Sequence, residues 1–309
     1  MRRWLALLRL VATLGVLALL WAALDMAAVA EALARADPRW LLLGGLALVA
    51  QTILSAARWR LTAARLGQRI TRRRAVSEYF LAQVLNQSLP GGVLGDAGRA
   101  VRGRSQAGLG TAAQAVVFER LAGQLGLLAL FSAGLFASLH AGARTPVPQH
   151  AALLGLGGLA LAGIAVSVIA YRAVPRIVQA FHQALLNPDV LPRQTVLSLG
   201  TAACNLAAFA FCARAVGVNL TWLDAVTLVP LILLTMVLPV TISGWGLREG
   251  TAAALLPLAG VAPAAAFAAS VVFGLTVAAS SLPGLLPLVR GRPTETETTL
   301  DRSAAKLTP

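Results

Sequence analysis

Two stretches interrupt an otherwise strongly apolar chain in the same way, and they restrict its possible folds more than any other feature. The first runs from Asn86 to Arg99 and the second from Leu238 to Glu249. Each has Leu-Pro after an apolar run, then glycine, then charges of both signs. Proline lacks a backbone donor and glycine adopts angles that helices do not use, so each stretch predicts a broken helix. In lipid, such a break persists only where protein or a water-filled cavity satisfies the freed backbone groups. We therefore expect a polar site inside a membrane domain.

Composition places the chain in a lipid bilayer. Of its 309 residues, 58% are hydrophobic and 12% are charged, whereas a soluble domain is nearer half apolar and a quarter charged. We expect an all-α, polytopic helical membrane protein. Residues 1–292 are expected to form one membrane-embedded domain, followed by a disordered polar tail at 293–309. The polar stretches between apolar runs are shorter than the roughly 50 residues that an independent soluble domain needs.

Arginine accounts for almost the whole net charge of +14. The arginines lie in short segments beside apolar runs, as in the cytoplasmic loops of membrane proteins, so we expect no nucleic-acid partner and place both termini in the cytoplasm. The first apolar run also fits a signal peptide, but it is long enough to span, and we favour an uncleaved anchor. About six full spans are predicted, at residues 5–24, 40–57, 111–140, 151–171, 195–216 and 263–289.

Charge also predicts how the two interrupted stretches cross the bilayer. The arginines flanking the first stretch are Arg58, Arg60, Arg65, Arg69, Arg72, Arg73 and Arg74 before it, and Arg99, Arg102 and Arg104 after it. Both flanks are then cytoplasmic, so residues 75–94 are expected to form a re-entrant hairpin with 90–92 near its tip. Counting the membrane crossings in the same way, we expect residues 224–262 to begin and end on the outer side of the membrane. Two hairpins from opposite faces are what an inverted repeat produces. The alternative is that one or both stretches are ordinary kinked spans.

Charges of both signs are expected in or near the hydrocarbon: Glu119, Arg120, Arg248 and Glu249. Charges at that depth cost about 2.5 kcal/mol or more and are normally paired or open to an aqueous cavity. We expect pairing across the two halves of the chain, with Glu119 meeting Arg248 or Arg99. Arg120 would then meet Glu249 or Asp96. One interpretation is that the charges bind a headgroup, with arginine as the phosphate fork. The other is that they lock the fold without touching a substrate.

The candidate substrate-binding residues come from the two broken stretches and from the charged pair between them. They are Asn86, Pro90, Gly91, Gly92, Asp96, Arg99, Glu119, Arg120, Pro239, Ser243, Gly244, Gly246, Arg248 and Glu249. The sequence contains no His-rich cluster, nucleophile elbow or metal-ligand set, so we predict no catalytic residues, no metal and no cofactor. It also lacks a nucleotide-binding loop. Any energy for transport would have to come from an ion gradient or from the lipid gradient.

Together these motifs resemble a known family. The Arg58-Trp59 pair, the stretch from Asn86 to Arg99, the Glu119-Arg120 pair and the stretch from Leu238 to Glu249 occur in one order. In that order they resemble the lysylphosphatidylglycerol synthase transmembrane region, or flippase-like domain family, from about residue 5 to 290. The resemblance implies a lipid flippase with two re-entrant helical regions. The soluble aminoacyl transferase of well-known members has no counterpart here, so synthase activity is not implied.

Three functions follow from these observations. The leading one is a lipid translocator of the bacterial inner membrane, acting on a phospholipid or a related anionic or aminoacylated lipid. Arg99, Arg120 and Arg248 would contact phosphate, with Asp96, Glu119 and Glu249 as counter-charges or proton carriers. The second is a membrane enzyme acting on a lipid headgroup. The third is a non-transporting subunit of a glycolipid, hopanoid or aminoacyl-lipid pathway that positions a lipid-modifying enzyme as its partner.

Overall fold

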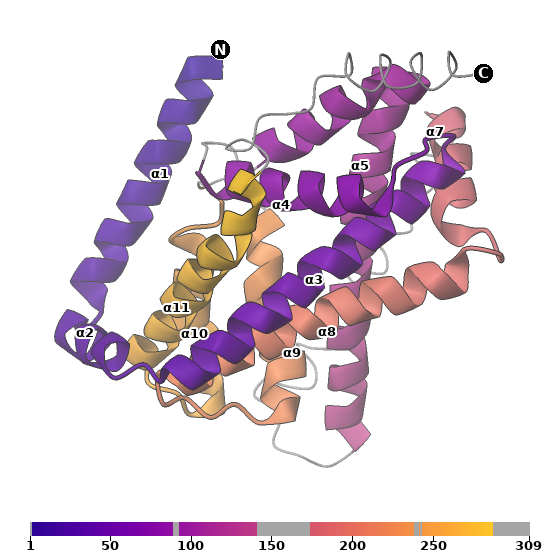
Figure 1. Ribbon diagram of the computed structural model, residues 1–309. Helices are drawn as coiled ribbons and strands as arrows, with labels where there is room; N and C mark the ends of the chain where they lie inside the picture. Colours follow the sequence, from indigo (N-terminus) through magenta and orange to yellow (C-terminus); the bar gives the residue numbers. More distant parts are fainter. Residues whose placement is uncertain (1, 89–92, 141–173, 238–240, 242, 287–309) are drawn as a thin grey trace, which may run out of the picture.

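The chain folds as a bundle of helices of unequal length. The computed structural model describes residues 2–88, 93–140, 174–237, 241 and 243–286, and these residues are helical or lie in turns. Two long helices, α3 (Pro38–Arg65) and α8 (Leu191–Ala215), cross the middle of the molecule (Figure 1). The expectation of an all-α, polytopic membrane protein is confirmed, because several helices are long and apolar enough to span a bilayer.

Four of the six predicted spans are present as single long helices. They are Pro38–Arg65, Ala107–Ser138, Leu191–Ala215 and Pro263–Leu285, the last made of α11 (Pro263–Ser281) and the 3-10 turn η4 (Leu282–Leu285). The span predicted at 151–171 and the polar tail at 293–309 lie outside the described residues.

The first predicted span, residues 5–24, corresponds to a single helix, and a sharp bend follows it. The chain forms α1 (Arg2–Ala23) and α2 (Met26–Ala34), which meet at an angle of 96°. The Asp25 carboxylate caps α2 by accepting hydrogen bonds from the amides of Ala27 and Ala28. The short helix α2 was not predicted, because its 9 residues are too few to span a bilayer.

Helices α3 and α8 lie antiparallel along their length. At one end of the pair, the Asp37 amide donates to the Ala215 carbonyl oxygen (2.9 Å). At the other end, the Gln194 side chain donates to the Thr62 hydroxyl (2.9 Å). The C-terminus of each helix therefore lies beside the N-terminus of the other. Whatever follows α3 and whatever follows α8 must start from opposite ends of the pair.

The element after α3 is a helical hairpin. Helix α4 (Arg72–Ser88) forms its first arm, and the beginning of α5 (Leu94–His140) forms its second. The arms are antiparallel, since Glu78 pairs with Arg102 (2.5 Å) and the Asn86 side chain accepts from the Gly95 amide (2.8 Å). A methyl group at Gly95 would overlap the carbonyl of the opposite arm, so glycine permits this close approach.

The return arm is longer than predicted. It extends to the kink at Gly108, which has φ of +82°, whereas the sequence placed the end of the hairpin at residue 94. Arg99 and Arg102 therefore belong to the hairpin and not to a cytoplasmic loop. The charge bias misled the prediction because polar residues on a buried helix face look like loop residues when only their hydropathy is read. The tip, residues 89–92, lies outside the described residues.

A second hairpin follows α8. Its first arm is α9 (Trp222–Leu234) with the 3-10 turn η2 (Thr235–Val237), and its return arm is α10 (Leu247–Leu255) with η3 (Leu256–Ala259). The described parts of the hairpins touch where the Ser243 hydroxyl donates to the Asn86 carbonyl oxygen. The hairpins therefore approach each other from opposite ends of the α3 and α8 pair, as two hairpins that enter a bilayer from opposite faces would.

Local geometry supports an inverted repeat. After α3 the chain turns at Gly67 with φ of +83°, and after α8 it turns at Gly217 with φ of +81°. Four residues later in each half, a threonine hydroxyl accepts from the amide three residues on, at Thr71 and at Thr221. The same turn and the same cap thus start both hairpins, which extends the Leu-Pro and glycine likeness seen in the sequence.

The outer faces of the spans suit lipid contact. On α3, Leu42, Leu46 and Ile53 are 65%, 56% and 47% exposed. Large apolar patches of this kind are rare on soluble monomers and mark a surface that something apolar covers. The largest buried apolar cluster joins α3 and α8 to the second hairpin and α11, with Phe209, Leu228 and Ile232 at its centre.

Candidate functional site

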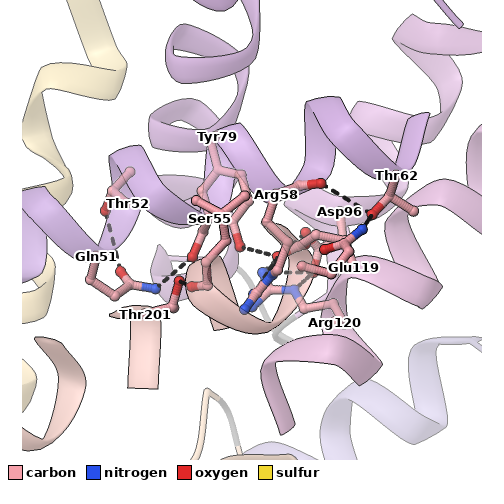
Figure 2. Close-up of polar contacts among 12 residues, drawn as sticks. Gln51, Thr52, Ser55, Arg58, Thr62, Tyr79, Asp96, Glu119, Arg120 and Thr201 are labelled. Carbon is pink, nitrogen blue, oxygen red and sulfur yellow. Dashed lines mark hydrogen bonds and ion pairs between the residues drawn. The ribbon is translucent and has the colours of Figure 1, made fainter. Parts of the chain in front are cut away.

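A buried ion pair connects helix α3 to helix α5. Arg58 on α3 donates to Glu119 on α5 through Nη2 (2.6 Å) and Nε (3.2 Å). The Tyr79 hydroxyl of α4 donates to the same Glu119 oxygen (3.1 Å). The side chains of Arg58 and Glu119 are 3% and 0% exposed. Three helices thus converge on one carboxylate, and Figure 2 shows the polar side chains around it.

A second carboxylate extends this network along the hairpin. Asp96, in the first turns of α5, pairs with Arg99 (2.5 Å) and with Arg120 (2.9 Å). Arg99 also lies 3.5 Å from the remaining oxygen of Glu119. Its guanidinium carbon stands 4.3 Å from the ring centroid of Tyr79, close enough for cation–π attraction. The Arg120 side chain is 42% exposed and is the most accessible of these charges.

We call this set the ionic cluster: Arg58, Tyr79, Asp96, Arg99, Glu119 and Arg120. Its three arginines and two carboxylates leave one positive charge in excess. An excess charge inside a membrane domain is costly unless an anion or water faces it. The accessible Arg120 is the place where such a counter-charge can reach the cluster.

The second half holds a smaller and more closed group. Arg248 pairs with the adjacent Glu249 and donates to the Ser270 hydroxyl and carbonyl oxygen, both at 3.1 Å. A methyl group at Gly274 would overlap the Arg248 guanidinium, so this glycine makes room for it. Glu249 also accepts from the Gly246 amide (2.7 Å), which caps α10. The group is buried and its charges balance.

The predicted pairing across the halves is wrong. Glu119 meets Arg99 and Arg120 meets Asp96, which were the same-half alternatives, and Arg248 pairs with its neighbour Glu249. Arg99 lies in the second turn of α5 and reaches Glu119 beyond the kink at Gly108, and Arg248 lies in the first turn of α10 and reaches Ser270 of α11. The Ser243–Asn86 hydrogen bond joins the two hairpins, whereas their charged side chains find partners in their own halves.

The remaining predicted residues belong to the two interrupted stretches, and the structure describes some of them. Asn86 and Ser243 bind each other, and Gly244 and Gly246 adopt φ of +79° and +83°. Pro90, Gly91, Gly92 and Pro239 lie outside the described residues. The prediction of a hydrated pocket around these prolines and glycines therefore stays a prediction.

Sequence reasoning missed the role of Arg58 and of the polar face that carries it. Arg58 was counted among the loop arginines, although it is buried. A periodic signal was available in Gln51, Ser55, Arg58 and Thr62, which recur at intervals of three and four residues and so share one helix face. Figure 2 shows these side chains on the same side of α3. Thr52, beside them, hydrogen-bonds Gln83 of α4 (2.8 Å).

No group of three or more His, Cys, Asp or Glu side chains that could hold a metal ion occurs among the described residues, which are 2–88, 93–140, 174–237, 241 and 243–286. The cluster instead joins guanidinium groups to carboxylates, a set suited to binding oxyanions.

Comparison with protein families agrees with the hairpins and their charges. The family model described as the lysylphosphatidylglycerol synthase TM region matches residues 6–284. The chain belongs to this family. A search among curated proteins finds no significant match. Family membership makes this a multi-pass membrane protein of a lipid-related family, and the geometry above describes how this member arranges its charges.

Proposed function

We propose that this protein moves a lipid with an anionic or aminoacylated phosphate headgroup between the leaflets of the bacterial inner membrane. The observation that carries the proposal is the excess positive charge of the ionic cluster, placed in a membrane domain where α3, α4 and α5 meet. A phosphate diester would balance this charge. The family match supports a lipid-related role.

Arg120 is the residue through which the headgroup would engage. Its guanidinium already holds Asp96 in a two-point contact (2.9 and 3.1 Å), and part of the side chain is exposed. A phosphate has the same paired oxygens as a carboxylate, so it can take the place of Asp96 on Arg120. Asp96 would remain held by Arg99 (2.5 Å). The acyl chains would stay against the exposed apolar faces of the spans.

Arg58 and Glu119 have a different part in this scheme. Both are fully enclosed, so they anchor the cluster and do not meet the headgroup. Arg248 is equally enclosed and already bound to Glu249 and Ser270, which assigns it a supporting role in the second half. Of the three arginines that the sequence nominated for phosphate contact, Arg120 is therefore the best placed.

A vesicle assay tests the proposal. The protein is reconstituted into liposomes with fluorescent phosphatidylglycerol, and dithionite quenching measures the fraction that changes leaflet. Wild type is expected to carry label between leaflets, and Arg120→Gln to lose most of this activity. Arg35→Gln is the matched control, because Arg35 lies in an exposed pair with Glu31 and its loss changes the net charge equally. Equal rates for Arg120→Gln and wild type would refute the proposal.

A further inference from the structure

A narrow cavity beside the ionic cluster has no part in the scheme above. It lies on the arginine-rich side of the molecule, where the end of α3 meets both arms of the first hairpin. Its internal volume is about 10 Å³, room for one water-sized group, and it opens to the surface. The residues that line it are Trp59, Gln68, Ile70, Arg74, Glu78, Arg99, Arg102, Gly103 and Ser105.

The residues that line this cavity carry hydrogen-bond donors that have no partner. Among the described residues, the buried nitrogen atoms left without an acceptor include Trp59 Nε1, Arg99 Nε and Nη1, and Arg102 Nη2. Gln68 Nε2 is a fifth. Trp59, Gln68 and Arg99 are each at least 97% buried. Buried donors are almost always satisfied in native proteins, so a group of them around one cavity indicates a missing acceptor.

The chemistry of these donors restricts what that acceptor is. Indole and guanidinium nitrogens donate only, in any side-chain orientation. A water molecule accepts about two hydrogen bonds, fewer than the five unpartnered nitrogen atoms of these residues can donate. An oxyanion accepts from several donors and has no proton to place.

Charge favours the same ligand. Arg74, Arg99 and Arg102 line the cavity with one acid, Glu78, which Arg102 neutralises at 2.5 Å. Arg74 is exposed at the surface and donates to the Arg102 carbonyl oxygen (3.3 Å), which holds it against the return arm. The cavity therefore combines residues with buried donors inside and the exposed guanidinium of Arg74 near its opening.

We propose that this cavity binds a phosphate oxyanion, with one oxygen inserted between Trp59, Arg99 and Arg102 and the others facing Arg74. The phosphate is either free or part of a lipid headgroup at the membrane surface. Because Arg99 belongs to both the cavity and the ionic cluster, the site also extends the proposed function: it would hold a headgroup one step before Arg120. Binding itself does not require that lipid be translocated.

Isothermal titration calorimetry on the full chain in phosphatidylcholine nanodiscs tests this site. Inorganic phosphate is titrated in one arm and dihexanoyl phosphatidylglycerol in the other. We expect saturable binding of inorganic phosphate if the site recognises the oxyanion alone. If the site also requires the rest of the headgroup, we expect the lipid to bind and inorganic phosphate not to bind. Either result supports the site, and no saturable binding in either arm overturns it.

Two variants locate the binding. Trp59→Phe removes one donor and is expected to weaken binding about tenfold, the effect of losing one hydrogen bond to a charged ligand. Trp222→Phe is its control, because Trp222 is 67% exposed. Arg74→Gln, a surface change that leaves the core intact, is expected to weaken binding several-fold, whereas Arg104→Gln on the exposed side of α5 should not. Unchanged affinity in both Trp59→Phe and Arg74→Gln would overturn the assignment.

The two proposals fail separately. Phosphate binding that persists in a protein that moves no lipid would reject translocation and keep the oxyanion site. Lipid movement in a protein without saturable phosphate binding would do the reverse.

Discussion

The buried pair of Arg58 and Glu119 permits the sharpest test of the ionic cluster. Glu119→Gln keeps the shape of the side chain but removes its charge. Arg58 then has no carboxylate partner, Asp96 remains paired with Arg99 and Arg120, and the net charge of the cluster rises from one to two. Removing one partner of a buried ion pair typically costs about 3–5 kcal/mol, because the other charge is left buried and unpaired.

The double variant Arg58→Gln/Glu119→Gln is the decisive comparison. It returns the cluster to its original net charge, so we expect it to be more stable than Glu119→Gln alone. The coupling energy in a double-mutant cycle should then reach about 2–4 kcal/mol. If the two residues shared only a neutral hydrogen bond, the coupling would be about 0.6 kcal/mol, the average for such bonds in a membrane protein.

Unfolding in mixed micelles of dodecylmaltoside and SDS, followed by circular dichroism, provides the free energies. The exposed pair of Glu31 and Arg35 serves as the control cycle, because exposed pairs couple by less than about 1 kcal/mol. A coupling near 0.6 kcal/mol between Arg58 and Glu119, or simple additivity, would refute the reasoning that their charges hold the hairpin to the spans.

Three further predictions concern backbone approach and capping. Gly95→Ala should destabilise the protein by about 1–3 kcal/mol by overpacking the hairpin arms, whereas Gly110→Ala, with nothing within 4 Å, should be neutral or slightly stabilising in the same unfolding assay. Gly274→Ala should displace the Arg248 guanidinium and lower stability by a similar amount, and a melting temperature equal to wild type would show that the space is not needed. Asp25→Ala should cost about 0.5–2 kcal/mol by uncapping α2; no loss would mean that the bend is held by packing alone.

Much of the fold was predictable because its signals are local. Leu-Pro followed by glycine marked both hairpins, and apolar runs located four spans that the structure confirms. Their order also indicated the family. The length of the first return arm was not predictable from hydropathy, since Arg99 and Arg102 look like loop residues until the opposite arm supplies Tyr79 and Glu78 as partners.

The candidate site was predictable only as a set of residues. The sequence named Asp96, Arg99, Glu119 and Arg120 but missed Arg58, and it did not reveal which charges touch. An arginine side chain is long enough to reach any neighbouring helix. Which carboxylate it pairs with therefore depends on how the helices are rotated and how closely they approach.

By itself, the amino-acid sequence determined that this is a helical membrane protein with two broken segments. Proline and glycine interrupt a helix at their own positions, and an apolar run forms a span from adjacent residues, so both signals are local. Only the tertiary structure decided that each hairpin pairs its charges within its own half, and that unpartnered donors surround a cavity. Those outcomes depend on distances between segments far apart in the chain, which no local pattern records.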